Sequence, residues 1–286
     1  MAQVTALFGI QPQAHYQARQ RQHQRQAQET RILALVRLIR REHPRMGGRK
    51  LLHILRPTLA REGLTMGRDR FFALLREHDL QVKRTKKPTR TTWPGHLRVP
   101  NRLPGLTVDA VHRVWGADIS YIRLRNGGFA YVYIIMDLYS RYLLAAYVAP
   151  SLVAEEAVIA VQKAVALASC DLNGLIHHSD HGSQYTSHIY REVLREHGIL
   201  ASMGTVGNAY DNAYTERVIG TLKHEYGLEG PFDSLQEARK TRDEGVHLYH
   251  TGRPHRGLVY ATPEAVYRGR SPAPALVFPP EMEATC

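Results

Sequence analysis

Apolar side chains recur at helical spacing in the first part of the chain. Between residues 29 and 42 they fall on one helix face, at Ile32, Leu35, Val36 and Ile39. Two further apolar clusters, near 51–55 and 71–75, predict two more short helices, and Pro57 is expected to limit the first of these two. Three short helices with tight turns and clustered arginines favour a helix-turn-helix-like module. A small bundle whose arginines merely keep it soluble is the alternative.

After residue 110 the pattern changes to strands. Three runs rich in Tyr, Ile and Val are separated by tight turns and predict an antiparallel meander at 114–124, 129–138 and 142–149. Helices and strands then alternate, with a helix at 153–168, a strand at 175–178, a helix at 189–197, a strand at 200–203 and a helix from about 211 to 226. This order predicts an α/β fold, with a mixed sheet of the ribonuclease-H-like type and helices on both faces.

These patterns predict five regions along the chain. They are a basic Gln/Arg-rich arm at 1–30, a helical, helix-turn-helix-like DNA-binding region at 31–82, a basic Pro-containing linker at 83–110, a ribonuclease-H-like catalytic core at 111–270 and a tail at 271–286. Eight of residues 11–28 are Gln, which indicates a solvated helix or a mobile arm. The linker begins with Lys83, Arg84, Lys86 and Lys87. These cations either lie along a phosphate backbone or keep the linker soluble.

Charge is unevenly distributed along the 286 residues, whose net charge is +12. Residues 1–110 hold 22 basic and 7 acidic side chains, whereas residues 111–286 hold 16 basic and 19 acidic ones. A basic half joined to a slightly acidic half predicts a polyanion-binding module attached to a second region that is not simply a polyanion-binding surface. The longest apolar runs stop near eight residues, and no secretory leader or CxxC pair is present. We therefore expect a soluble cytoplasmic protein with a nucleic-acid partner and no membrane partner.

Three carboxylates stand where this layout could use them. Asp118 lies inside the first predicted strand, Asp180 directly follows the strand at 175–178, and Glu216 lies on the last predicted helix. Convergent carboxylates repel one another and are stabilised together by hard divalent cations such as Mg²⁺. Two such ions about 4 Å apart can support an in-line displacement at phosphorus. A capping or ion-paired role is the alternative for each acid taken singly.

The runs around these acids resemble the DDE transposases of bacterial insertion sequences. The resemblance is carried by HSDHGSQYTS, SMGTVGNAYDNAYTERVIGTLKHEY and YHTGRPHRGL, and upstream by REHPRMGGRKL and GRDRFFALLREHDL. It covers most of residues 30–267. The group it indicates has a catalytic domain similar to retroviral integrases and is usually encoded in the second of two overlapping frames.

This resemblance implies Mg²⁺-dependent DNA cleavage and strand transfer at insertion-sequence ends. Asp118, Asp180 and Glu216 would be the catalytic triad and the ligands of two Mg²⁺ ions, with Mn²⁺ as a substitute. Lys223, seven residues after Glu216, would contact DNA near the transposon end, or else be a solvated helix lysine. The implied partners are the inverted-repeat ends and target DNA, bound by a dimer or higher oligomer. The implied location is the bacterial cytoplasm, at the nucleoid.

Other basic side chains are candidate DNA contacts. His178 is interpreted as an orienting or DNA-contacting residue rather than a metal ligand, because carboxylate sites for phosphoryl transfer favour oxygen ligands. Arg253 and His255 either contact DNA or take part in a structural ion pair. The chain departs from the family pattern at Val218 and Ile219, where aromatic residues are frequent, and at His250, where Asn is usual.

Two other functions remain open from the sequence. A ribonuclease-H-like nuclease that only hydrolyses DNA would use the same acids. A DNA-binding regulator, inactive until it is fused to an upstream-frame helix-turn-helix protein, would also carry the basic first half. Joining of a 3′-hydroxyl end to target DNA distinguishes both from a transposase.

Overall fold

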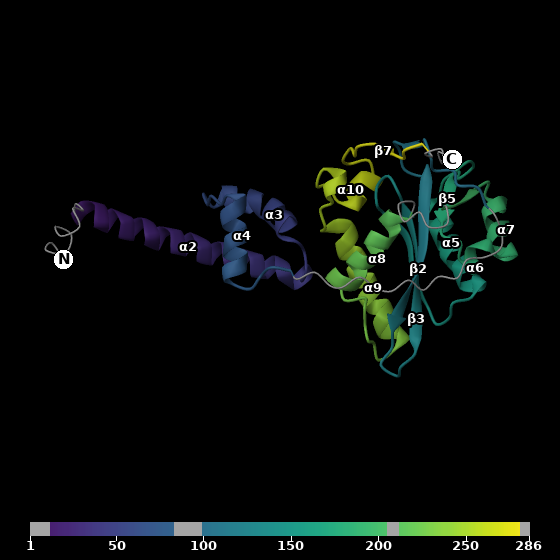
Figure 1. Cartoon of the computed structure of the whole chain (residues 1–286), viewed down its shortest axis with the longest axis horizontal. Coiled ribbons are helices and arrows are strands. Elements are labelled where there is room, and N and C mark those ends of the chain that lie inside the picture. Colours follow the sequence, from purple (N-terminus) through teal and green to yellow (C-terminus); the bar gives the residue numbers. More distant parts are fainter. Residues whose placement is uncertain (1–11, 83–98, 205–211, 281–286) are drawn as a thin grey trace, which may run out of the picture. The chain divides into compact units, whose positions relative to one another are not determined.

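The computed structural model describes residues 12–82, 99–204 and 212–280. The chain divides into two compact units, residues 1–84 and residues 85–286, which are drawn in Figure 1. No helix in these described ranges is long and apolar enough to cross a membrane.

The first unit contains three helices, α2 (Pro12–Glu42), α3 (Gly48–Arg61) and α4 (Arg68–Glu77). Their buried faces form one apolar core, which includes Ile32, Val36, Leu51, Leu55, Phe71 and Leu74. The three predicted helices are therefore confirmed. The Gln-rich segment from residue 12 forms one continuous helix with the apolar segment, which agrees with the solvated-helix alternative for these residues. One detail differs from the prediction, because Pro57 lies inside α3, between the buried Leu55 and Leu59.

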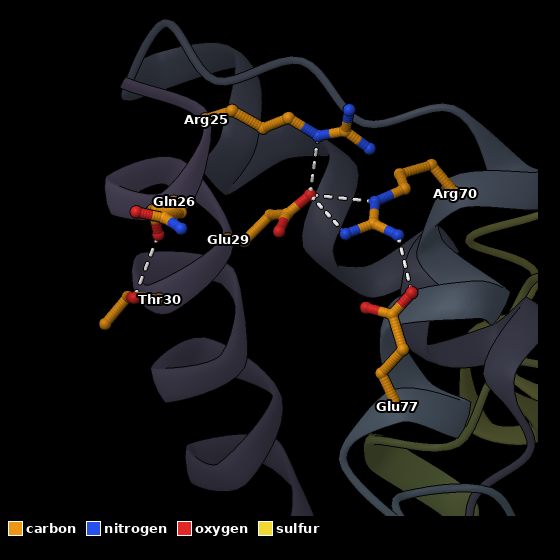
Figure 2. A network of polar contacts seen from close by, with 6 residues as sticks. All are labelled: Arg25, Gln26, Glu29, Thr30, Arg70 and Glu77. Carbon is orange, nitrogen blue, oxygen red and sulfur yellow. Dashed lines mark hydrogen bonds and ion pairs between the residues drawn. The ribbon is translucent and has the colours of Figure 1, made fainter. Parts of the chain in front are cut away.

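Ion pairs fasten α2 to α4. The Glu29 carboxylate accepts hydrogen bonds from Arg25 on its own helix and from Arg70 on α4, at 3.0 and 2.8 Å (Figure 2). Arg70 also donates to Glu77 at 2.7 Å. The pKa of Glu29 lies below its usual value because the two arginines, chiefly Arg70, stabilise the ionised carboxylate.

The second unit is built on a five-stranded sheet in the order β4-β3-β2-β5-β6. The strands are β2 (Val114–Arg123), β3 (Phe129–Asp137), β4 (Leu143–Ala149), β5 (Ile176–Ser179) and β6 (Leu200–Met203). The first three form the predicted antiparallel meander, and β5 and β6 add in parallel to β2. This mixed sheet, with three consecutive strands followed by two that cross over, is the ribonuclease-H-like arrangement that the sequence predicts.

Helices cover both faces of this sheet (Figure 1). They are α5 (Ala154–Ala168), α6 (Ser183–Thr186), α7 (His188–Glu196), α8 (Ala213–Glu225), α9 (Leu235–Thr251) and α10 (Pro263–Tyr267), with a 3₁₀ turn at Arg256–Leu258. One apolar core lies between the sheet and α8 and α9, and includes Val114, Ile122, Val218 and Tyr249. The other lies against α5 and α7, and includes Trp115, Tyr133, Val161 and Tyr190. Alternate residues of β2 thus face opposite cores.

Segments near both ends of the described part of the second unit pack on its core. Strand β1 (Thr107–Val108), in the predicted linker, pairs with β7 (Leu276–Val277), in the predicted tail. Leu103, Val108 and Phe278 are buried in the core beneath α8 and α9. The linker and tail predictions differ from the structure here because these apolar side chains have a core to join.

Arginine side chains bond to backbone carbonyls of both outer strands of the sheet. On β4, Arg239 of α9 donates to the carbonyl of Val148 at 3.1 Å, and Arg242 of α9 donates to the carbonyl of Ala146. On β6, Arg102 donates from Nε to the carbonyl of Ala201 at 3.1 Å. The outward backbone groups at these positions are thereby satisfied within the chain.

Candidate active site

The three predicted carboxylates come from three neighbouring elements of the second unit. Asp118 lies in the middle of β2, Asp180 follows the last residue of β5, and Glu216 lies in the first turn of α8. Side chains alternate along a strand, so Asp118 shares a face of β2 with Val114 and Ile122, which pack in the core beneath α8. Asp180 comes four residues after Ile176, an even number along an extended chain, so its side chain lies on the same side of the sheet as that of Ile176.

Backbone amides hold two of these carboxylates. The Oδ1 atom of Asp118 accepts a hydrogen bond from the amide of Ile119 at 2.8 Å. The Oδ1 atom of Asp180 accepts one from the amide of Gly182 at 3.0 Å. A Cβ atom at Gly182 would lie only 3.0 Å from that same oxygen, so the glycine leaves room for the Asp180 carboxylate.

The site carries mutually repelling negative charge. Burial raises the pKa of Asp118 to about 8, and the charges of Asp180 and Glu216 raise it as well. The amide of Ile119 and the ammonium group of Lys223 act in the opposite direction on the same pKa. Burial also raises the pKa of Asp180, against the amide of Gly182. The electrostatic influence of Asp180, Glu216 and Lys223 on the carboxyl group of Asp118 indicates that each of the three lies near Asp118.

This donor set suits a hard divalent cation, although it does not form a complete cage. Within the ranges that the structure describes, no three His, Cys, Asp or Glu side chains are grouped closely enough to hold a metal ion. Mg²⁺ is usually held by one or two carboxylates together with waters and substrate phosphates, so a closed protein cage is not required. Two features fit such an ion. The site offers carboxylate oxygens as ligands, and a bound cation would offset the repulsion that the charges of Asp180 and Glu216 exert on the carboxylate of Asp118.

A glycine in β2 allows α8 to pack closely against the sheet. A Cβ atom at Gly116 would lie 2.9 Å from Cγ2 of Thr215 and 2.9 Å from Cδ2 of Leu138. Asn212, which precedes α8, donates a hydrogen bond to the carbonyl of Ala117 at 3.4 Å. The first turn of α8, with Glu216, is thus set against the strand segment that carries Asp118. A glycine inside a strand is the sequence signal for such a close approach.

We expect Gly116→Ala to lower the free energy of unfolding by about 1–3 kcal/mol, the usual cost of an added methyl group in a packed core. Thr215 is β-branched and stiff, so its helix has to move to make room. Gly220→Ala is the matched control, because an added Cβ at Gly220 meets nothing within 4 Å. That change should be neutral or stabilising by about 1 kcal/mol. Urea unfolding of both variants checks this, and equal stabilities would contradict the close approach.

The turn between β3 and β4 also holds the start of α8. The guanidinium of Arg141 stacks on the ring of Tyr214, 3.9 Å from its centroid. The backbone of Arg141 is itself fixed, because its amide donates to the carbonyl of Asp137 at 2.9 Å and its carbonyl accepts from the Tyr249 hydroxyl at 3.1 Å. Tyr214 lies two residues before Glu216, so this stack helps to position the acid. Sequence reasoning missed Arg141 because nothing local distinguishes it from a solvated turn arginine.

The structure places His178 inside the fold. Its side chain is buried, and Nδ1 makes a 2.9 Å hydrogen bond with the hydroxyl of Ser202. Burial lowers the pKa of His178 to about 3. Nε2 of His178 is buried without a hydrogen-bond partner among the described residues. This position favours the orienting role for His178 over contact with DNA.

Arg253 forms the buried ion pair that was the alternative to DNA contact. Its side chain is 7% exposed and donates to both carboxylate oxygens of Glu225, at 2.8 and 2.7 Å. A third guanidinium nitrogen lies 3.2 Å from Nε2 of His255. The structure therefore favours the structural reading for Arg253 and links His255 to it.

Lys223 is half-buried on α8, near the acids. Burial lowers its pKa, whereas Glu229 and Asp118 oppose that shift. Its mutual influence with Asp118 places Lys223 near that acid, seven residues after Glu216 on the same helix. The predicted DNA contacts of the linker, Lys83, Arg84, Lys86 and Lys87, lie outside the described residues.

Comparisons with known proteins agree on one kind of domain. Two family models, both described as an integrase core domain, match residues 109–209 and 197–263. The chain is 34% identical to an insertion element IS600 uncharacterized 31 kDa protein of Shigella sonnei, over 74% of this chain and 78% of that one. It is 32% identical to the transposase for insertion sequence element IS629 of the same organism, over 75% and 73% of the two chains.

Two solved structures show a more distant likeness. The HTLV-2 integrase catalytic core domain in complex with magnesium has a TM-score of 0.43 at 15% identity, over 58% of this chain and 99% of that one. An intasome of simian T-cell lymphotropic virus has a TM-score of 0.46 at 17% identity, over 84% and 76% of the two chains.

Proposed function

The chain belongs to the bacterial insertion-sequence transposases with an integrase-type catalytic core, which are DDE polynucleotidyl transferases, and we propose how its residues carry out the reaction. Transposases of this family act on DNA and use divalent metal ions. We propose that Asp118, Asp180 and Glu216 are the catalytic acids. The observation that carries this assignment is their placement on three neighbouring elements, with Asp118 inside β2, Asp180 directly after β5 and Glu216 in the first turn of α8. The raised pKa of Asp118, to which burial contributes most and Asp180 and Glu216 contribute further, supports it.

The reaction proceeds in two displacements at phosphorus. In the first, a water oxygen bonds to the phosphorus at the end of the element, and the bond from that phosphorus to the 3′ oxygen breaks. The released 3′ oxygen takes up a proton and becomes the 3′-hydroxyl end. In the second displacement this hydroxyl attacks a phosphodiester of the target DNA, which joins the element to one target strand and releases the 3′-hydroxyl of the other fragment.

Each residue of the site has a separate task in these steps. The carboxylates of Asp118, Asp180 and Glu216 would hold two Mg²⁺ ions, or Mn²⁺ in their place, which activate the nucleophile and stabilise the leaving oxygen when bound. The amides of Ile119 and Gly182 keep two of the carboxylates fixed in direction. Lys223 would bind a phosphate next to the reacting one, because its ammonium group lies near Asp118 and phosphate is its natural partner.

The DNA partners follow from this chemistry. We propose that the helical region at 31–82 holds the inverted-repeat ends and that the core at 111–270 joins them to target DNA, in the bacterial cytoplasm at the nucleoid. Two ends require two active sites, so the working complex on DNA is a dimer or a higher oligomer. Fusion to an upstream-frame protein would add a second DNA-binding module.

A joining assay tests this function. A labelled duplex that ends in the inverted repeat flanking the gene is incubated with supercoiled target plasmid and Mg²⁺ or Mn²⁺. We expect labelled DNA to become covalently attached to the plasmid, and EDTA to prevent it. Cleavage without any joining would favour the hydrolytic nuclease. Metal-independent binding with neither reaction would favour the regulator, unless the fusion protein restores joining.

A further inference from the structure

The first half of α2 is exposed wherever the structure describes its side chains. In the described part of the chain, every residue from Tyr16 to Ala27 is exposed, whereas Ile32 and Val36 further along the same helix are fully buried. Figure 1 shows α2 running on beyond α3 and α4 as a single rod. A helix that is polar all round gains no stability from burial in its own fold. This part of α2, residues 12–28, is called the projecting helix below.

The composition of the projecting helix suits an anionic partner. It contains Arg19, Arg21 and Arg25 and no Asp or Glu. It also lacks Val, Ile, Leu, Met and Phe, so it offers no apolar seam for a second protein helix. Seven of its seventeen residues are Gln, whose amide can bond to phosphate oxygens or to the edge of adenine.

The cations are arranged around the helix and not along one side. Arg21 and Arg25 are four residues apart and share a face, which is the face of Ile32 and Val36. Arg19 lies nearly opposite, because two residues turn an α-helix through about 200°. A helix inside a DNA groove has phosphates on both sides and requires this kind of distribution.

The base of the projecting helix is held in place by the network of Figure 2. Glu29, only 14% exposed, bonds to Arg25 in the preceding turn and to Arg70 on α4. Arg25 stays 60% exposed while its Nε atom is tied to Glu29. The network fixes the direction in which the helix leaves the bundle, so its arginines are presented from a rigid support.

We propose that the projecting helix binds duplex DNA by lying in its major groove, an inference that rests on the proposed function. The major groove is about 12 Å wide and admits an α-helix. Seventeen residues at 1.5 Å per residue give the helix a length of about 25 Å, enough to cross a groove from one phosphate wall to the other. The helix supplies binding energy through phosphates and extends the DNA contact of the three-helix unit.

Removal of two arginines tests the charge. In the full-length chain, we expect Arg19→Gln/Arg21→Gln to weaken binding to a fluorescent duplex of random sequence about tenfold. The slope of the logarithm of the binding constant against the logarithm of the salt concentration should fall by the amount expected for about two phosphate contacts. The control, Lys240→Gln/Arg270→Gln, makes the same change in net charge at two exposed positions of the second unit. Equal effects of the two double variants would overturn the proposal.

A helix-breaking change tests the conformation. Gln22→Pro keeps every charge but interrupts α2 in its projecting part. We expect it to weaken DNA binding as much as the arginine variant does, whereas Gln22→Ala should bind like the wild type. Unchanged binding by Gln22→Pro would mean that a flexible basic arm is sufficient, which contradicts a helix in the groove. Thermal unfolding shows whether the rest of the unit, from Glu29 onward, remains folded.

These measurements are made in EDTA, so they do not depend on catalysis. If the two variants lose DNA binding while the wild-type chain fails to join DNA, the projecting helix is a DNA-binding element but the transposase mechanism is overturned. If the wild-type chain joins DNA and the two variants bind DNA normally, the mechanism stands and the proposal for the projecting helix is overturned.

Discussion

Asp180→Asn should reduce both DNA cleavage and strand transfer at least about a thousandfold, because charge stabilisation by metal ions is worth several kcal/mol and each 1.36 kcal/mol is a factor of ten in rate. Asparagine keeps the shape of the side chain and an oxygen for the amide of Gly182, so the loop after β5 should be unchanged. DNA binding should be equal or tighter, since one negative charge is removed beside the scissile phosphate. The joining assay and anisotropy with the same duplex measure the two effects separately.

The matched control is Asp109→Asn, the same chemical change at an exposed position outside the site. It should join DNA at the wild-type rate. Asp118→Asn and Glu216→Gln should each cause a loss similar to that of Asp180→Asn, and combining them should add little, because residues that act as one unit are not additive. Wild-type joining by Asp180→Asn would exclude this carboxylate from the catalytic set.

Arg253→Met should lower the free energy of unfolding of the second unit by about 3–5 kcal/mol, the usual cost of leaving one partner of a buried ion pair alone. Methionine fills much of the same volume, but the carboxylate of Glu225, 20% exposed, then has no cation to bond to. The double variant Arg253→Met/Glu225→Met should recover a large part of this loss, because it leaves no buried charge unpaired. Urea unfolding followed by circular dichroism measures all three.

An exposed ion pair provides the comparison. Arg268 bonds to Glu264 at 2.8 Å with 51% of its side chain exposed, so Arg268→Met should cost no more than about 1 kcal/mol. The experiment also separates the two readings of Arg253. Weaker DNA binding by Arg253→Met with unchanged stability would restore the DNA-contact hypothesis and contradict the structural one.

The strands around the acids could be predicted because their signals are local. The Asn126-Gly127-Gly128 turn and the alternation along β2 and β3 are visible in the sequence, and the observed strands end within one residue of the predicted ones. An Asp inside a strand, at position 118, also stands out without tertiary information. Recognising the three acids as one set depended on the resemblance of their surrounding runs to a known family.

The elements that the sequence analysis missed depend on contacts between distant residues. Helix α9 shows few apolar positions, and it packs through Ala238, Gly245 and Tyr249 while its arginines reach the edge of β4. The role of Gly116 appears only when Thr215, ninety-nine residues later, lies over it. The burial of Arg253 likewise depends on a carboxylate on another helix, and a motif that contains arginine favours a DNA contact when it is read alone.

The arginines along the two outer strands limit how the protein can assemble. An open sheet edge recruits further strands, and this is a common route to aggregation for proteins crowded at high local concentration. Here the carbonyls of Ala146, Val148 and Ala201 are already bonded within the chain. A second copy of the chain therefore cannot add a strand at these positions without displacing the arginines.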